Sequence, residues 1–407
     1  MIVDDLRALD KEQRSAFLAS LLGWTLDAFD FFLLTFIIKD IAGEFRVEPS
    51  KVLGAITLTL MARPFGAFFF GWLAERFGRR PVLMADVLIY AVLAFASAFS
   101  PNLIVLLVLR TAFGFAMGGE WGIGASLALE TVPVKSRGVI SGLLQEGYAL
   151  GFLLASLANL LLPAIHWRGM LMLGVLPALL VLYIRRNVPE SPAFEARRAR
   201  TLAQGERTNL LRVLFVKRLP IVLYAVLLMT CFNFLSHGTQ DVYPTFLKAQ
   251  HRFAPWLVTT LAVCANVGAI VGGVTFGALS ERIGRRRAIV LAALLALPII
   301  PLWAFSTTPL LLGLGAFLIQ VAVQGAWGVV PVHLNELSPE EARGAFPGTV
   351  YQLGNFIASG NAVIQGRIAE AHGNNYGLAM AWVAGIVAVL LALLTWFGPE
   401  AKGKRFG

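Results

Sequence analysis

The sequence predicts an all-α membrane protein with twelve transmembrane helices in two related six-helix halves. The first observation is composition: 57% of the 407 residues are hydrophobic and only 14% are charged, whereas a soluble domain carries about 25% charged residues. The second is a succession of apolar runs of about 18 residues or more, each long enough to cross the roughly 30 Å hydrocarbon layer as a helix. The third is an internal repeat of the polar loops between these runs.

Short polar segments separate twelve apolar runs, and each run is expected to form one span. The runs cover 16–38, 51–74, 82–99, 103–131, 137–161, 168–186, 218–247, 256–279, 288–305, 309–335, 345–369 and 377–397. The longer Arg-rich segment 187–217 begins with proline-punctuated residues and is expected to be a cytoplasmic linker. It would join an N-terminal bundle, 1–186, to a C-terminal bundle, 218–407.

The distribution of Lys and Arg predicts the orientation in the membrane. If the N-terminus is cytoplasmic, about 25 of the 34 Lys and Arg residues fall on the cytoplasmic side and about 7 outside, which is the positive-inside bias. We therefore expect a monomer in the inner (plasma) membrane with both termini in the cytoplasm. Nucleic acid is not an expected partner, because binding it would need a basic face on a soluble domain. No cleavable signal is expected, since Met1–Ser15 is charged and lacks a small-residue cleavage site.

The two cysteines, Cys231 and Cys264, both lie in apolar runs. Two thiols in such surroundings indicate packing residues and argue against a disulfide framework or a zinc site. No metal or cofactor is expected.

Polar loops of the first half return in the second half 206 residues later. The loop Gly-Trp-Leu-Ala-Glu-Arg-Phe-Gly-Arg-Arg-Pro at 71–81 is matched by Gly-Ala-Leu-Ser-Glu-Arg-Ile-Gly-Arg-Arg-Arg at 277–287. The matched residues include Gly71, Glu75, Arg76, Gly78, Arg79 and Arg80, which return as Gly277, Glu281, Arg282, Gly284, Arg285 and Arg286. A second loop agrees at the same offset, with Glu130, Pro133, Arg137 and Gly138 returning as Glu336, Pro339, Arg343 and Gly344. Two distant matches with one offset indicate duplicated halves.

These loops resemble the signature G-x-L-a-D-r-x-G-r-[KR] of the major facilitator superfamily, with Glu75 and Glu281 at the usual Asp position. Arg110, followed by Gly114 and Gly118-Gly119, resembles the fourth-helix signature of the same superfamily. The resemblance implies halves that rock about a midplane site. The acidic residues would pair with arginines of a neighbouring helix while one gate is closed, and the glycines would allow tight turns and close helix approach. A purely topological role for the arginines is the alternative.

Charged side chains within spans are costly in a bilayer and are therefore candidates for function. They are Asp27, Asp30, Arg63, Asp86, Arg110, Glu120, Glu146, His237 and Asp241. Groups without a polar counterpart in the other half are the better candidates for substrate binding. We assign Asp27, Asp30, Glu120 and Glu146 to candidate proton coupling and Asp86 to a local structural pair. Arg110 is a candidate for a structural or proton-linked role.

Arg63 lies near the middle of the second run and aligns with Ala269 of the other half. A permanent charge at that depth needs an anion, and a guanidinium grips a carboxylate through two parallel hydrogen bonds. We expect Arg63 to bind a substrate carboxylate. The alternative is a structural salt bridge to Asp27, Asp30 or Glu146.

The seventh run carries an unusual polar stripe. Asn233, His237 and Asp241 are four residues apart and stack on one helix face, with Ser236 and Gln240 beside them. A polar stripe on a membrane helix must face protein or a wet cavity. A His and an Asp at this spacing could share a proton, which suggests a proton relay. A polar packing network between the halves is the alternative.

The stripe matches every specified position of the motif N-x-x-[ST]-H-x-[ST]-Q-D-x-x-x-T. It therefore resembles the lactate/pyruvate:proton permeases typified by fungal monocarboxylate carriers, which share a branch with the sialic acid permeases. The resemblance implies that Asn233, His237, Gln240 and Asp241 shape substrate binding and proton coupling. The family also uses an Arg in its second helix and a Gln-x-x-Asn pair in its eleventh helix, which match Arg63 and the pair Gln352 and Asn355 here. An aromatic-polar patch in its fifth helix has a loose counterpart at Tyr148.

The leading hypothesis is proton-coupled symport of a small monocarboxylate such as lactate or pyruvate. The expected substrate-binding residues are Arg63, Asn233, Gln240, Gln352, Asn355 and Tyr148, with His237 and Asp241 handling the proton. A second hypothesis changes the substrate to sialic acid or another sugar or organic acid, although the short linker lacks room for the extra helices usual in sialic acid members. A third hypothesis is a membrane-embedded enzyme or sensor. The sequence argues against it, because it contains no G-x-S-x-G or phosphate-loop motif.

Overall fold

The computed structural model describes residues 2–161, 165–204, 209–404 and 406, and over these residues all regular structure is helical. Residues 1, 162–164, 205–208, 405 and 407 of the expected domains and linker lie outside the described residues. The N-terminal half contains α1 (Ile2–Arg7), α2 (Lys11–Phe45), α3 (Pro49–Phe77), α4 (Arg79–Ser97), α5 (Leu103–Thr131), α6 (Arg137–Gln145), α7 (Gly147–Leu161), α8 (Trp167–Met172) and α9 (Pro177–Asn187). The connecting segment contains α10 (Pro192–Gln204) and α11 (Leu210–Arg212). The C-terminal half contains α12 (Leu219–Gln240), α13 (Tyr243–Thr245), α14 (Pro255–Ile283), α15 (Arg285–Phe305), α16 (Pro309–Leu337), α17 (Phe346–Ala358), α18 (Asn361–Ala371) and α19 (Tyr376–Phe397).

Eleven stretches of the described residues are long and apolar enough to cross a membrane. Some are composite, because α6 and α7 together form the stretch Val134–Leu161, and α12 and α13 belong to Leu219–Gln250. The remaining expected span, 345–369, corresponds to α17 and α18, which are 13 and 11 residues long and are separated at Ser359 and Gly360. Each piece alone is shorter than the roughly 20 residues that a crossing needs. The predicted all-α membrane protein is confirmed, with this one span interrupted.

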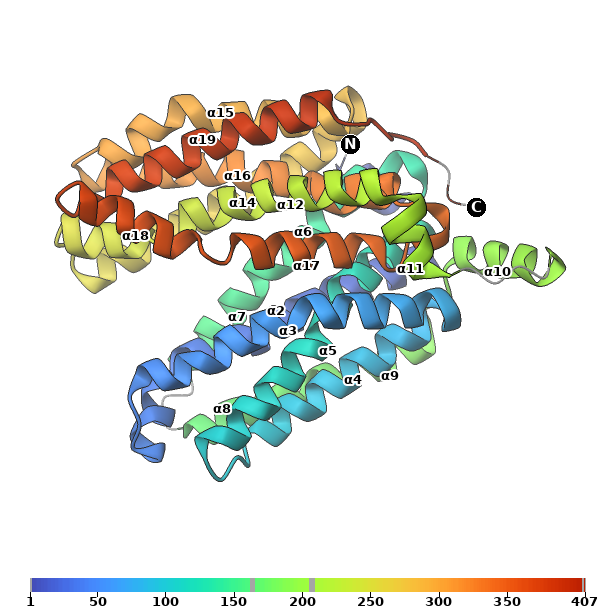
Figure 1. Cartoon of the computed structure of the whole chain (residues 1–407), viewed down its shortest axis with the longest axis horizontal. Coiled ribbons are helices and arrows are strands. Elements are labelled where there is room, and N and C mark those ends of the chain that lie inside the picture. Colours follow the sequence, from blue (N-terminus) through green and yellow to red (C-terminus); the bar gives the residue numbers. More distant parts are fainter. Residues whose placement is uncertain (1, 162–164, 205–208, 405, 407) are drawn as a thin grey trace.

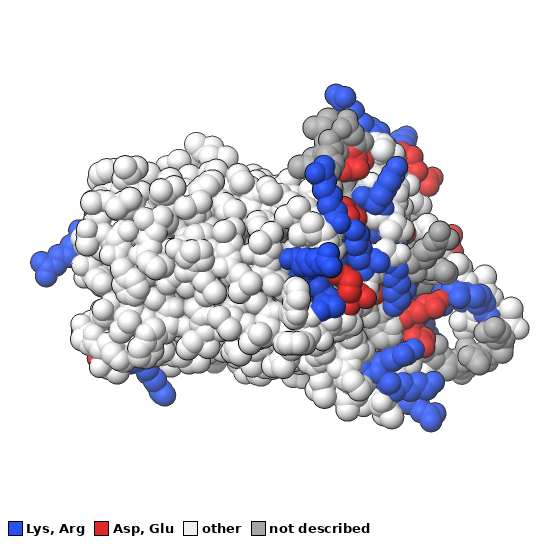
Figure 2. All heavy atoms as spheres, turned by 90° about the horizontal axis from the view of Figure 1, so that it is seen from above, with Lys and Arg blue, Asp and Glu red and all other residues white. Residues whose placement is uncertain are grey.

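The two halves form separate bundles that converge toward one end (Figure 1). We call this the linker end, because α10 projects from it, and we call the opposite end the distal end. Charged side chains gather at the linker end, a broad belt of uncharged residues covers the middle of the face seen in Figure 2, and a few charged side chains appear again at the distal end. This arrangement matches a membrane-spanning body with a charged, solvated end.

Glycines let the long helices of each half approach backbone to backbone. A methyl group at Gly114 or Gly118 of α5 would collide with the backbone of α3 at Thr59 or Arg63. The C-terminal half repeats the device, because Gly272 of α14 lies against the backbone of α16. Close packing of small residues is a main source of helix association in membranes. This close packing fixes the position of α3 and therefore the position of Arg63, which α3 carries.

Candidate substrate-binding site

A polar cavity of about 640 Å³ lies between the halves. Its N-terminal wall comes from α2, α3 and the α6–α7 junction, and its C-terminal wall comes from α12, α16 and α17. The cavity brings together these residues that the sequence predicted: Arg63, Tyr148, Asn233, His237, Gln240, Asp241 and Asn355. The polar stripe of the seventh span therefore faces a cavity.

Arg63 presents a shielded guanidinium to this cavity. Its side chain is 4% exposed, and its Nη2 lies 3.4 Å from Oδ2 of Asp27. The guanidinium carbon lies 5.6 Å from the centre of the Phe31 ring. A strong charge-assisted bond is nearer 2.7–2.9 Å, and this long contact is the one side-chain hydrogen bond that Arg63 forms within the described residues. Arg63 therefore keeps donors for a second carboxylate that enters the cavity.

His237 bridges two acceptors on the opposite wall. Its Nδ1 lies 3.1 Å from Oδ2 of Asp241, and its Nε2 lies 3.0 Å from Oδ1 of Asn355 on α17. Both ring nitrogens donate only when the imidazole is protonated. The two acceptors thus fit an imidazolium ring, with a proton on both nitrogens, in this arrangement. Both side chains of the ion pair are about one-third exposed, so a proton can reach them through the cavity.

Gln352 does not take the position that the sequence predicted. It is buried, with 1% exposure, and it does not line the cavity, whereas Tyr351 and Asn355 do. The reason is helical phase: residues 351 and 355 are one turn apart on one face, and residue 352 is rotated away from it by about 100°. Tyr351 was missed because a single aromatic residue in an apolar run gives no sequence signal.

A row of aromatic rings crosses from one half to the other. Trp24 stacks on Tyr148 with centroids 5.6 Å apart, and Trp121 lies 4.7 Å from Tyr351 of the other half. Tyr351 in turn lies 5.6 Å from Trp327. Trp121 and Trp327 recur at the 206-residue offset, and this repeat was their only sequence signal. Of these rings, Trp24, Tyr148, Trp327 and Tyr351 line the cavity, and they give it a rigid apolar surface on which a substrate body can stack.

Several predicted proton-coupling residues lie behind the cavity wall. Asp27, Asp30, Arg110 and Glu120 are at most 2% exposed, and none of them lines the cavity. The guanidinium of Arg110 lies 4.0 Å from the Phe113 ring centre, and among the described residues it has no hydrogen-bond partner. Asp27 reaches the cavity only through Arg63. Coupling through this buried group stays a prediction.

The remaining predicted acids are dispersed. Asp86 is fully buried, and neither of its carboxyl oxygens has a hydrogen-bond partner among the described residues, so the expected local pair is not formed. Glu146 lines a smaller adjoining cavity of about 320 Å³ instead of the main one.

The two signature loops form matching ion-pair clusters at the linker end. Arg79 lies 3.2 Å from both Glu75 and Glu130. The equivalent pairs of the C-terminal half join Arg285 to Glu281 and Glu336, each at 2.9 Å. Every partner is related by the same offset, so the loops share one geometry.

The same acids also reach across to the other half. The carboxylate of Glu75 accepts a hydrogen bond from the backbone N–H of Gly344, and Glu281 accepts one from Gly138. Gly71 lies against the backbone of Ala345, where a side chain would collide. These contacts close the linker end.

The other loop residues shape the turns around these clusters. Gly78 and Gly284 have φ of 109° and 97°, which favours glycine. Arg80 donates to the carbonyl of Arg185 at 2.6 Å. Arg76 lies 5.3 Å from the Phe77 ring centre, and the carbonyl of Arg282 accepts from Lys402 at 3.4 Å.

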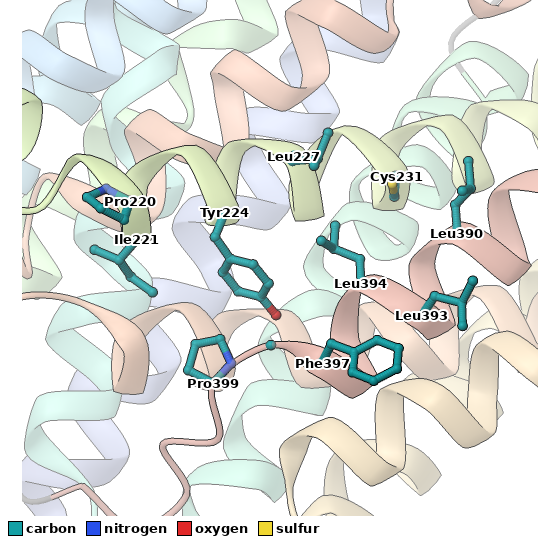
Figure 3. A pocket seen from close by; sticks show the side chains of 11 residues that line it. Pro220, Ile221, Tyr224, Leu227, Cys231, Leu390, Leu393, Leu394, Phe397 and Pro399 are labelled. Atoms are coloured by element: carbon teal, nitrogen blue, oxygen red, sulfur yellow. The ribbon is translucent and has the colours of Figure 1, made fainter.

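A second large hollow, of about 690 Å³, is an apolar groove between α12 and α19 (Figure 3). Its walls are mainly aliphatic, and Leu227, Leu393 and Phe397 are more than half exposed on the outer surface of the C-terminal half. Among its lining side chains, Tyr224 carries a hydroxyl, Cys231 carries a thiol, and the others are apolar. Such a groove suits lipid chains and offers little to orient a polar substrate.

Comparisons with known proteins agree with this architecture. The family model described as Major Facilitator Superfamily matches residues 20–359. A putative metabolite transport protein of Haemophilus influenzae is 31% identical, with 96% of this chain and 97% of that protein covered. A carboxylic acid transporter protein homolog of Saccharomyces cerevisiae is 26% identical over 97% of this chain and 67% of its own length. The sialic acid transporter NanX of Escherichia coli is 27% identical, with 97% and 96% covered.

Among solved structures, the proton:xylose symporter XylE bound to 6-bromo-6-deoxy-D-glucose has the same fold. The TM-score is 0.78 at 20% identity, with 97% of this chain and 98% of that chain covered. The family match spans most of the chain, and the related proteins are named as transporters. The chain is therefore a transport protein, not an enzyme, and it belongs to the major facilitator superfamily.

Proposed function

We propose that this protein is a proton-coupled symporter of organic carboxylic acids, with small monocarboxylates such as lactate and pyruvate as the first candidates. One observation carries the proposal: Arg63 on one wall of the cavity faces the same space as the His237–Asp241 pair on the other. The first group suits an anion and the second suits a proton. The names of the carboxylic acid and sialic acid relatives support an organic acid as substrate.

In the proposed cycle a carboxylate enters from the distal end and binds Arg63 in competition with Asp27. A proton held by His237 and Asp241 balances the charge of the bound anion. The loaded protein then opens the linker end by breaking the Glu75 and Glu281 bonds, and its halves rock about the cavity. In this proposal the protein lies in the inner membrane, with both termini in the cytoplasm.

A bulkier acid is the second candidate, and the size of the cavity favours it. A volume of about 640 Å³ falls in the range of about 300–1,000 Å³ typical of sites for drug-sized ligands. Lactate would leave most of this space to water. A sugar acid such as sialic acid would fill more of it and would meet the aromatic rings.

Uptake by proteoliposomes tests the proposal. Labelled lactate is offered with and without an inward proton gradient, and unlabelled pyruvate, sialic acid and glucose compete with it. We expect the gradient to accelerate uptake and both acids to compete, while neutral glucose does not. Competition by glucose alone would show that the carboxylate is not recognised.

A further inference from the structure

A side cavity continues from the main one toward α14. It has a volume of about 320 Å³ and shares Tyr148, Gln240, Asp241 and Gln324 with the main cavity. Its further polar residues include Glu146, Thr239, Asn266 and Gln320. We call it the amide alcove, because five residues of its lining carry carboxamides: Gln145, Gln240, Asn266, Gln320 and Gln324. A ligand held by Arg63 could extend into it without leaving the site.

Three carboxamides of the alcove are each fixed by one hydrogen bond that their N–H donates. Gln240 donates to Gln320 at 3.0 Å, Gln320 donates to Thr239 at 3.2 Å, and Asn266 donates to the carbonyl of Ala262 at 3.0 Å. Each carboxamide has a second N–H and a carbonyl oxygen with two lone pairs. The alcove therefore offers fixed donors and acceptors together.

Glu146 adds a carboxyl group that the protein itself does not engage. The residue is 7% exposed, its side chain forms no ion pair or hydrogen bond within the described residues, and its carboxyl oxygens are open to the alcove and not sealed in protein. Its carboxyl rests over Gly273 of α14, where any side chain would collide with it. A carboxyl that faces a wet cavity can exchange its water for a hydroxyl of a ligand. Since Glu146 lines the alcove, a ligand that reaches the alcove can form this bond.

The chemistry of the lining discriminates among ligands. Hydroxyl groups both donate and accept, so they satisfy carboxamides and a carboxyl together, whereas an alkyl chain satisfies neither. A second carboxylate would meet Glu146 and Asp241, and within the described residues no Lys or Arg lines the alcove to balance it.

We propose that the amide alcove is a subsite for the hydroxyl groups of a polyhydroxylated carboxylic acid, and that Glu146 determines the preference for such acids. This inference rests on the proposed function, because it takes the substrate carboxylate to lie at Arg63. Glu146 accepts a hydroxyl hydrogen from the substrate, while Gln240 and Asn266 bond the neighbouring hydroxyls.

Binding of three six-carbon acids to the purified protein tests the proposal. Gluconate carries hydroxyls, hexanoate carries none, and 6-aminohexanoate carries a terminal ammonium. Each affinity follows from the rise in unfolding temperature with ligand concentration. We expect gluconate to bind at least about tenfold more tightly than hexanoate, and Glu146→Gln to remove most of this advantage, as expected for loss of a hydrogen bond to a charged group. Asn266→Ala should reduce the advantage less.

The control is Asp40→Asn, which removes an exposed carboxylate at the end of α2 and should leave the ratio unchanged. The proposal is overturned if hexanoate binds wild type as tightly as gluconate, if 6-aminohexanoate binds most tightly, or if Glu146→Gln preserves the ratio. If gluconate and hexanoate bind equally tightly and Arg63→Ala weakens both, the alcove proposal fails while the proposed function stands. Binding of lactate but of none of the three acids would also defeat the alcove alone, whereas binding of neither these acids nor lactate and pyruvate would defeat the proposed function as well.

Discussion

The carboxylate of Glu75 in the N-terminal half accepts a hydrogen bond from the backbone N–H of Gly344 in the C-terminal half. The bond from Gly138 to Glu281 is its counterpart at the same offset. Because both bonds cross between the halves, they must break when the linker end opens. The structure is therefore closed at this end, and the cavity extends toward the distal end past Thr57 of α3.

Weakening both bonds should favour opening of the linker end. In the double variant Glu75→Gln, Glu281→Gln, two charge-assisted bonds become neutral, and we expect about a tenfold rise in the open population. The readout is alkylation of Ser126→Cys, a buried position that bonds Asn335 across the halves, in a background without native cysteines. The exposed substitution Glu195→Gln on α10 serves as control, and an unchanged alkylation rate in the double variant would contradict the gating role.

The C-terminal segment fastens the same end. The Phe406 ring centre lies 3.5 Å from the guanidinium carbon of Arg137 and 4.3 Å from that of Arg343, which come from different halves. Cation–π contacts contribute about 0.5–2 kcal/mol, so Phe406→Ala should raise alkylation at the same reporter several-fold. Phe406→Trp keeps an aromatic face and should retain slow alkylation. Fast alkylation of the Trp variant would show that the ring face is not what holds the halves.

Arg63 should dominate the affinity for the carboxylate. Arg63→Ala removes the cationic partner, and we expect binding of any carboxylic acid substrate to fall by at least about 100-fold. Arg63→Lys keeps the charge but loses the two-pronged geometry, so an intermediate loss of about tenfold is expected. Isothermal calorimetry on detergent-solubilised protein measures both. Equal affinities for Lys and Arg would mean that charge alone holds the substrate.

Asp241 should link transport to the proton. Asp241→Asn retains the size of the side chain and removes the anion beside His237. We expect the variant to lose acceleration by an inward proton gradient, while exchange of labelled for unlabelled substrate at equal pH continues. A variant that the gradient still accelerates as it does wild type would move proton coupling to the buried group around Asp27 and Asp30.

Much of the fold could be predicted because the chain is duplicated, so the sequence signal of each half is supported by the other half. The 206-residue offset marks both signature loops, and the structure gives their ion pairs one geometry. The polar stripe was predictable because residues four apart share a helix face, and His237 indeed reaches both Asp241 and Asn355.

Other features depend on tertiary partners that no local pattern reveals. The sequence motif could not show that Gln352 points away from the cavity while Tyr351 points into it, since a phase error of one residue rotates a side chain by about 100°. The sequence did not predict the helix break at Ser359 and Gly360, because hydropathy is averaged over a window longer than these two residues. The bonds from Gly138 and Gly344 were hidden because backbone N–H groups leave no trace in sequence.

Direct measurement of proton movement tests the central claim. Proteoliposomes in weakly buffered medium receive lactate or gluconate without any imposed gradient, and the external pH is recorded beside the uptake of label. We expect the medium to become more alkaline in step with substrate entry, a protonophore to abolish the change, and Arg63→Ala to show neither signal. Substrate uptake at full rate with no change in external pH would contradict proton-coupled symport.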